Sequence, residues 1–171
     1  MGVQLLFLSS VAFGLTAWAV VIGLYAWPQL RGRSRADALR PLLVVHAFRF
    51  IGLSFLVPGV VSPDLPMAFA RGAAYGDLVA AVLALLALAS LRSKLGVAVA
   101  WIFNIWGTFD LLNAFYQAAA SGLSPGQLGA AFFLPTFLVP MLLLTHGLAF
   151  RILVRPSGRH EFKHASLEPA A

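Results

Sequence analysis

The sequence predicts an all-α, polytopic integral membrane protein built as a bundle of five transmembrane helices. Of its 171 residues, 60% are hydrophobic and only 11% are charged, compared with about 25% charged in soluble domains. The apolar residues fall in five runs, each long enough to cross a hydrocarbon core of ~30 Å, which takes about 20 residues. Basic residues lie in short clusters between these runs, as they do beside anionic headgroups. No remaining segment is long enough to fold as a separate catalytic domain.

Each predicted span is an apolar run, and the five spans cover residues 3–27, 41–61, 73–91, 95–119 and 129–154. The first has its basic residues after the run, whereas a cleaved signal peptide has them before it, so we expect this span to remain as a helix. The second contains Pro58-Gly59 near its end, and the loop that follows is expected to fold partly back onto the bundle. A very short loop joins the third and fourth spans, which are therefore expected to be antiparallel neighbours. Pro135 and Pro140 interrupt the fifth span, and the carbonyl groups they free must be bonded by neighbours or water.

The loop charges predict the orientation, because Lys and Arg collect on the cytoplasmic side of short loops. Of the twelve Lys and Arg residues, ten lie in loops one and three or at the C-terminal end of the chain from Arg151 onward, Arg71 lies on the other side, and Arg49 is intramembrane. We therefore expect a bacterial-type inner (plasma) membrane protein with its N-terminus outside and its C-terminus in the cytoplasm. Residues 155–171 are predicted to form a polar cytoplasmic tail. The net charge of +6 then reflects topology, with the lipid bilayer as partner and no nucleic acid.

Polar side chains inside the spans are the place to seek function, because an ionisable group at bilayer depth costs ~2.5–3.5 kcal/mol on insertion scales. By helical rise from the nearest cytoplasmic basic residue, Arg49 lies ~14 Å and Asn104 ~15 Å into the membrane. Asp77 and Asp110 lie ~22 Å and ~24 Å deep, and Asn113 lies ~28 Å deep. These five residues form the candidate ligand or ion cluster.

The two carboxylates reach the same depth on neighbouring helices. Such a pair would share a proton, bind a cation or take Arg49 as counter-charge, and the long arginine side chain can span much of the ~8–10 Å that separates their levels. The alternative interpretation is structural, with these side chains joining helices without doing chemistry.

His46 and His146 are a second candidate site. They lie ~9 Å and ~8 Å from the cytoplasmic ends of their helices, and imidazoles at equal depth on two helices can bind a haem iron as axial ligands. The chain contains neither cysteine nor a CxxCH attachment motif, so a haem at this site would be haem b, and the alternative is that each histidine hydrogen-bonds near the cytoplasmic interface. Two histidines are too few for a bare transition-metal site, and no metal site is predicted.

The run Phe103-Asn104-Ile105-Trp106, together with five spans and many aromatic residues, resembles the translocator/tryptophan-rich sensory proteins. That resemblance implies a membrane protein that binds porphyrins or sterols. It covers only these few residues, because the W-x-P-P pattern of that family is missing and the F-N motif falls on the fourth span rather than the third. No residue role is carried over from it.

Three functions are compatible with these patterns. The first is a binding or transport protein that holds a proton, an ion or a small amphipathic ligand in the polar cluster. The second is a haem b-binding electron-transfer subunit that uses His46 and His146. The third is a structural or assembly subunit of a membrane complex. A membrane enzyme with Asp77 or Asp110 as acid or base is less favoured, because the sequence shows no nucleophile, metal box or phosphate motif.

Overall fold

The computed structural model describes residues 2–155. All the secondary-structure elements in this range are helical. Five helical segments are long and apolar enough to cross a membrane, and they cover Val3–Leu30, Arg35–Leu56, Met67–Ser90, Lys94–Ala120 and Leu134–Leu153. The prediction of an all-helical chain with five such segments is confirmed. Apart from Arg155, the predicted tail lies outside the described residues.

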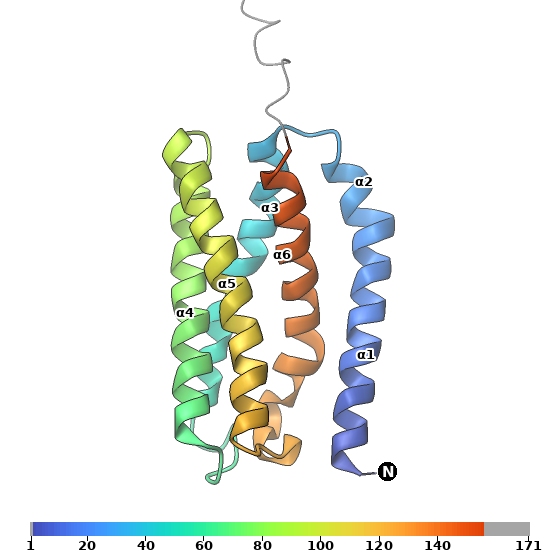
Figure 1. Cartoon of the computed structure of the whole chain (residues 1–171), viewed down its shortest axis with the longest axis vertical. Helices are drawn as coiled ribbons and strands as arrows, with labels where there is room; N and C mark the ends of the chain where they lie inside the picture. The colour runs from blue at the N-terminus through green and yellow to red at the C-terminus, as the bar shows by residue number, and fades with distance from the viewer. Residues whose placement is uncertain (1, 156–171) are drawn as a thin grey trace, which may run out of the picture.

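The segments run side by side, with their connecting loops at the two ends of the bundle (Figure 1). Three of them contain a stretch that departs from α-helical geometry. In chain order the elements are α1 (Val3–Val21), the π-helical turn η1 (Ile22–Ala26), α2 (Trp27–Leu30), α3 (Arg35–Ala47), the 3-10 segment η2 (Phe48–Leu56), α4 (Met67–Ser90), α5 (Lys94–Ala120), the 3-10 segment η3 (Pro125–Phe132), the π-helical turn η4 (Leu134–Leu138) and α6 (Val139–Leu153).

Helix α1 stands at one side of the bundle, against α6 and η4 (Figure 1). None of its residues is buried. Trp18 fixes its position by donating a hydrogen bond from Nε1 to the Phe137 carbonyl at 3.0 Å, which is one carbonyl of the proline-interrupted region. Gly14 allows the close approach, because a Cβ at this position would overlap the Thr136 carbonyl.

The second segment is shifted from its predicted range of 41–61. It begins at Arg35, because Ser34 caps the helix by accepting a hydrogen bond from a first-turn backbone amide at 3.2 Å. It ends at Leu56, because the chain then turns through Pro58-Gly59 with the glycine at φ +83°, a conformation that favours glycine. Hydropathy alone extended the helix into this apolar turn.

Helices α4 and α5 are antiparallel neighbours joined by a short turn, as predicted (Figure 1). The turn leads into α5 through Ser93, whose hydroxyl accepts a hydrogen bond from the Gly96 amide at 3.0 Å. On α4, the residues Ala80, Ala84 and Ala87 are fully buried. Such small side chains let membrane helices approach closely.

The fifth helical segment begins at Leu134 rather than at residue 129. Gly129 has φ +53° and interrupts the helical geometry of η3, so the apolar residues before Leu134 belong to a separate turn. The Ala130 amide donates to the Val60 carbonyl at 2.8 Å. The loop after the second helix therefore folds back onto this part of the bundle, as expected.

The buried apolar residues form two clusters that leave a polar layer between them. One cluster includes Leu43, Phe103 and Ile152, and the other includes Phe55 and Phe69. On the second, fourth and fifth helical segments the buried polar residues lie along the chain between or next to the members of these clusters, and on the third segment the partly buried Asp77 does so. This layer holds the candidate site.

Candidate functional site

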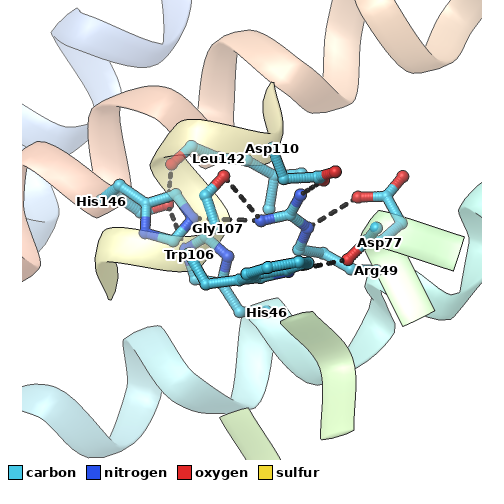
Figure 2. Close-up of polar contacts among 10 residues, drawn as sticks. His46, Arg49, Asp77, Trp106, Gly107, Asp110, Leu142 and His146 are labelled. Carbon is cyan, nitrogen blue, oxygen red and sulfur yellow. Dashed lines mark hydrogen bonds and ion pairs between the residues drawn. The ribbon is translucent and has the colours of Figure 1, made fainter. Parts of the chain in front are cut away.

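Arg49 is the centre of a buried polar network (Figure 2). Only 1% of the residue is exposed, and four of its N–H groups have acceptors. Nε donates to Asp77 Oδ1 and Nη2 donates to Asp110 Oδ2, each at 2.7 Å. Nη1 donates to the Gly107 carbonyl and to His146 Nε2, each at 3.2 Å. The arginine therefore pairs directly with both carboxylates.

The network joins four of the five membrane-length segments. Arg49 comes from η2, Asp77 from α4, Asp110 from α5 and His146 from α6. A charged hydrogen bond in a low-dielectric interior is stronger than in water. The contacts of Arg49 therefore tie together all the segments except the one that contains α1.

His146 is held as a neutral ring in one tautomer. A guanidinium group can only donate, so His146 Nε2 accepts from Arg49 and the ring proton lies on Nδ1. That proton is donated to Asn104 Oδ1 at 2.7 Å. The Asn104 amide nitrogen donates in turn to the main-chain carbonyl of His146 at 3.3 Å. Asn104 thus joins the network through the histidine and does not contact the carboxylates.

His46 lies beside this histidine. Its Nε2 is 3.0 Å from Thr145 Oγ1. The Thr145 hydroxyl gives its own proton to main-chain carbonyls one turn earlier, so it accepts from His46. The His46 and His146 rings pack together with 4.2 Å between their centroids, and the Phe103 ring lies 5.0 Å and 5.1 Å from them.

This packing bears on the haem hypothesis. Axial ligands approach iron from opposite faces of the porphyrin, whereas the rings of His46 and His146 are in mutual contact. Three of their four ring nitrogens have partners within the protein. To bind haem b between them, the rings would have to separate and His146 would have to lose one of its two ring hydrogen bonds, whereas His46 Nδ1 has no hydrogen-bond partner among the described residues.

Two glycines make room for the carboxylates, and neither was singled out by hydropathy or charge. A Cβ built on Gly52 would overlap the Asp77 carboxylate, and a Cβ built on Gly76 would overlap the Asp110 carboxylate. Both carboxylates therefore pack against bare backbone. A larger residue at either position would compete with an oxygen atom of the ion-pair network.

Gly107 does the same for the other side of the network. Its Cβ would lie 2.6 Å from the His146 ring and 2.7 Å from Arg49 Nη1, distances too short for real contacts. Sequence spacing contains a signal for these glycines, because each lies one or three residues from a charged residue inside a span. That signal becomes specific only when the neighbouring helix is known.

Trp106 and Asn113 are two further polar residues of α5, and only Trp106 hydrogen-bonds to a neighbouring helix among the described residues. Trp106 donates from Nε1 to the Gly76 carbonyl at 3.4 Å, which connects α5 to α4 beside the carboxylates (Figure 2). Asn113 is half-buried, and within residues 2–155 its side chain makes no hydrogen bond. Of the five residues in the predicted cluster, Asn113 is the one that the structure does not bring into the network.

A cavity of about 220 Å³ adjoins the network. Asp77 and Asp110 are its charged lining residues among those that the structure describes, and Gln4 of α1 adds an amide. On α5 the lining extends from Asp110 to Ala119, so the cavity runs from the ion pairs toward the end of the bundle where α5 ends. Its remaining walls are almost entirely apolar.

Comparison with known proteins identifies a family. A family profile described as "Domain of unknown function (DUF8737)" matches residues 6–154. The chain belongs to this family. No curated protein and no solved structure matches it. The part that matches the DUF8737 family contains every residue of the network and nearly all of the five membrane-length helices.

Proposed function

We propose that this protein is a small multi-pass membrane protein that binds a small amphipathic ligand or an ion in its cavity, at the end where Asp77 and Asp110 lie. The observation that carries the proposal is the position of Asp77 and Asp110, which share Arg49 and also line the apolar cavity. An ion pair that served only to join helices would need no adjoining cavity.

The charges of the cluster support this proposal. Two carboxylates face one guanidinium group, and His146 is neutral, so with both carboxylates ionised one negative charge has no counter-charge in the network. A buried charge without a partner is costly. A proton or a cation that entered through the cavity would offset it.

We further propose a bacterial-type inner-membrane location with the N-terminus outside and the C-terminus in the cytoplasm. Basic residues gather at the end of the bundle that would then be cytoplasmic. There the guanidinium carbons of Arg151 and Arg155 lie 4.1 Å and 4.7 Å from the centroid of the Trp27 ring. An arginine-tryptophan group of this kind suits the membrane interface. In this orientation the cavity lies in the outer half of the bundle.

Native mass spectrometry of the purified protein tests the binding proposal. Wild-type protein is expected to retain a small-molecule adduct that Ala114→Phe loses, because Ala114 lines the cavity and the larger side chain would fill it. Leu112→Phe is the matched control, because Leu112 lies on the exposed face of the same helix. An adduct retained equally by both variants would contradict the proposal.

Proton transfer is a second candidate function, and the continuity of the network favours it. Asp110, Arg49 and His146 are linked by hydrogen bonds, and the ring of His46 packs against that of His146. Proteoliposomes that contain a pH-sensitive dye test this candidate. Proton flux is expected to fall with Asp110→Asn and to persist with Asp64→Asn, which removes an exposed loop carboxylate. Equal flux in both variants would exclude a role of the network.

A further inference from the structure

We infer that the ligand of the cavity is a small hydrophobic ammonium ion, with its charged head between the Asp77 and Asp110 carboxylates and the phenylalanine rings of the cavity wall. This inference names the ligand class and rests on the proposed function of the same site. It is carried by the unused carboxylate oxygens, the bonding of Arg49 and the aromatic lining.

The carboxylates retain capacity for a cation. Asp77 binds Arg49 through Oδ1 and Asp110 binds it through Oδ2. Within residues 2–155 no hydrogen-bond donor is assigned to the second oxygen of either side chain, and these oxygens pack against backbone, Asp77 Oδ2 beside Gly52 and Asp110 Oδ1 beside Gly76. Both residues line the cavity, with side-chain exposures of 14% and 10%. An N–H donor or a quaternary ammonium group that entered the cavity would meet these carboxylates.

Arg49 offers little to an anionic ligand. Four of its five N–H groups are already bonded to Asp77, Asp110, Gly107 and His146. An anion would have to displace a carboxylate from the guanidinium group, and it would add to the excess of negative charge. Among the described residues, no Lys, Arg or His side chain lines the cavity. The electrostatics therefore select for a positive ligand.

The wall of the cavity has the chemistry that suits an organic cation. Phe7, Phe55, Phe69 and Phe115 line it. The face of an aromatic ring attracts a cation, and aromatic cages are a recurrent way to bind quaternary ammonium groups. Apart from the two carboxylates and the Gln4 amide, the other side chains of the wall are apolar and give no hydrogen bonds to a hydrated metal ion. An alkyl or aryl ammonium matches both parts of the lining.

The size of the cavity limits the ligand. About 220 Å³ is below the ~300–1,000 Å³ of pockets for drug-sized molecules. A ligand with one ammonium head and one short alkyl or aryl group is therefore favoured over a lipid or a sterol.

A pair of probes of equal shape tests the charge requirement. Benzyltrimethylammonium carries the positive head, and neopentylbenzene is its neutral carbon isostere. Binding of each to the full-length protein in nanodiscs is measured by calorimetry and by the shift in thermal unfolding. Benzyltrimethylammonium is expected to bind at least tenfold more tightly than neopentylbenzene, and Asp110→Asn is expected to remove this preference. Asp64→Asn is the matched control and is expected to keep it.

Asp110→Asn removes one ion pair of Arg49, so a second variant avoids dependence on its folding. Phe115→Leu leaves the ion pairs intact and removes one ring from the cavity wall. It is expected to weaken benzyltrimethylammonium binding severalfold while changing neopentylbenzene binding little. An equal loss for both probes would contradict a cation–aromatic contact.

The outcomes separate this inference from the proposed function. Equal affinity for the charged and neutral probes, both blocked by Ala114→Phe, would overturn the ammonium assignment and leave a ligand-binding cavity. If neither probe binds, the ammonium assignment is overturned. The proposed function then also fails if the native protein retains no Ala114-dependent adduct and conducts no Asp110-dependent proton flux.

Discussion

Arg49 Nη2 lies 2.7 Å from Asp110 Oδ2, although the two residues are 61 positions apart and belong to different helical segments. The same guanidinium group lies 2.7 Å from Asp77. A single guanidinium group therefore contacts two carboxylates in the interior of the bundle, and the loss of any member changes the surroundings of the other two.

This arrangement predicts strong coupling between Arg49 and Asp110. Arg49→Leu is expected to destabilise the protein by about 3–5 kcal/mol, as when one partner of a buried pair is removed, because two carboxylates then face each other. Adding Asp110→Asn is expected to recover part of this loss, with an interaction energy of ~0.5–3 kcal/mol. Thermal unfolding in detergent of wild type, the two single variants and the double variant gives the coupling. Additive losses would mean that Arg49 is compensated elsewhere.

The glycine contacts predict a position-specific effect of alanine. Gly76→Ala is expected to cost ~1–3 kcal/mol, the usual range for overpacking, because the new Cβ overlaps the Asp110 carboxylate. Gly72→Ala on the same helix is the control. A Cβ there meets nothing within 4 Å, so that variant should be neutral or gain up to ~1 kcal/mol of helix stability. Equal unfolding temperatures for the two variants would contradict the close packing of Asp110.

The contact between His46 and His146 makes a prediction about colour. Protein purified after expression with adequate haem is expected to be colourless. The His46 and His146 rings pack against each other and leave no space between them for a porphyrin. A Soret band that is lost in both His46→Ala and His146→Ala would contradict this expectation and support axial ligation. The alanine variants also serve as controls against haem bound loosely elsewhere.

The distribution of basic residues predicts the orientation of the chain. A fluorescent protein fused after Ala171 is expected to fluoresce in the cytoplasm, and an alkaline phosphatase fused there is expected to be inactive, because Lys and Arg favour the cytoplasmic side. An active phosphatase fusion would contradict this orientation, and the number of crossing helices would then need to be re-examined. The segment at Met67–Ser90 would then be the first to re-examine.

Much of the fold and the main ion pairs can be predicted from sequence. The apolar runs predict the five helices to within several residues. Counting helical rise places Asp77 and Asp110 at one depth and Arg49 within reach, and the structure brings these three together. Depth is predictable because it depends only on position along a helix.

The remaining features depend on how each helix is rotated about its axis and on which helix faces it. Hydropathy and spacing in a single sequence do not predict either. Asn113 shares a helical stripe with Asp110, yet it lies outside the network. His46 and His146 have equal depth, and the structure adds that their rings touch. The roles of Gly52 and Gly107 require knowledge of which side chain lies opposite each one.

The winding of η2 has a further consequence. Its buried residues are Arg49, Gly52 and Phe55, which are three positions apart. In a 3-10 helix the residues at i and i+3 eclipse one another, so these three form a single row along the segment. In an α-helix of 3.6 residues per turn, each would be rotated by about 60° from the one before, and Phe55 by about 120° from Arg49. The tighter winding lets one edge of the helix supply the counter-charge, the clearance for Asp77 and a wall of the cavity.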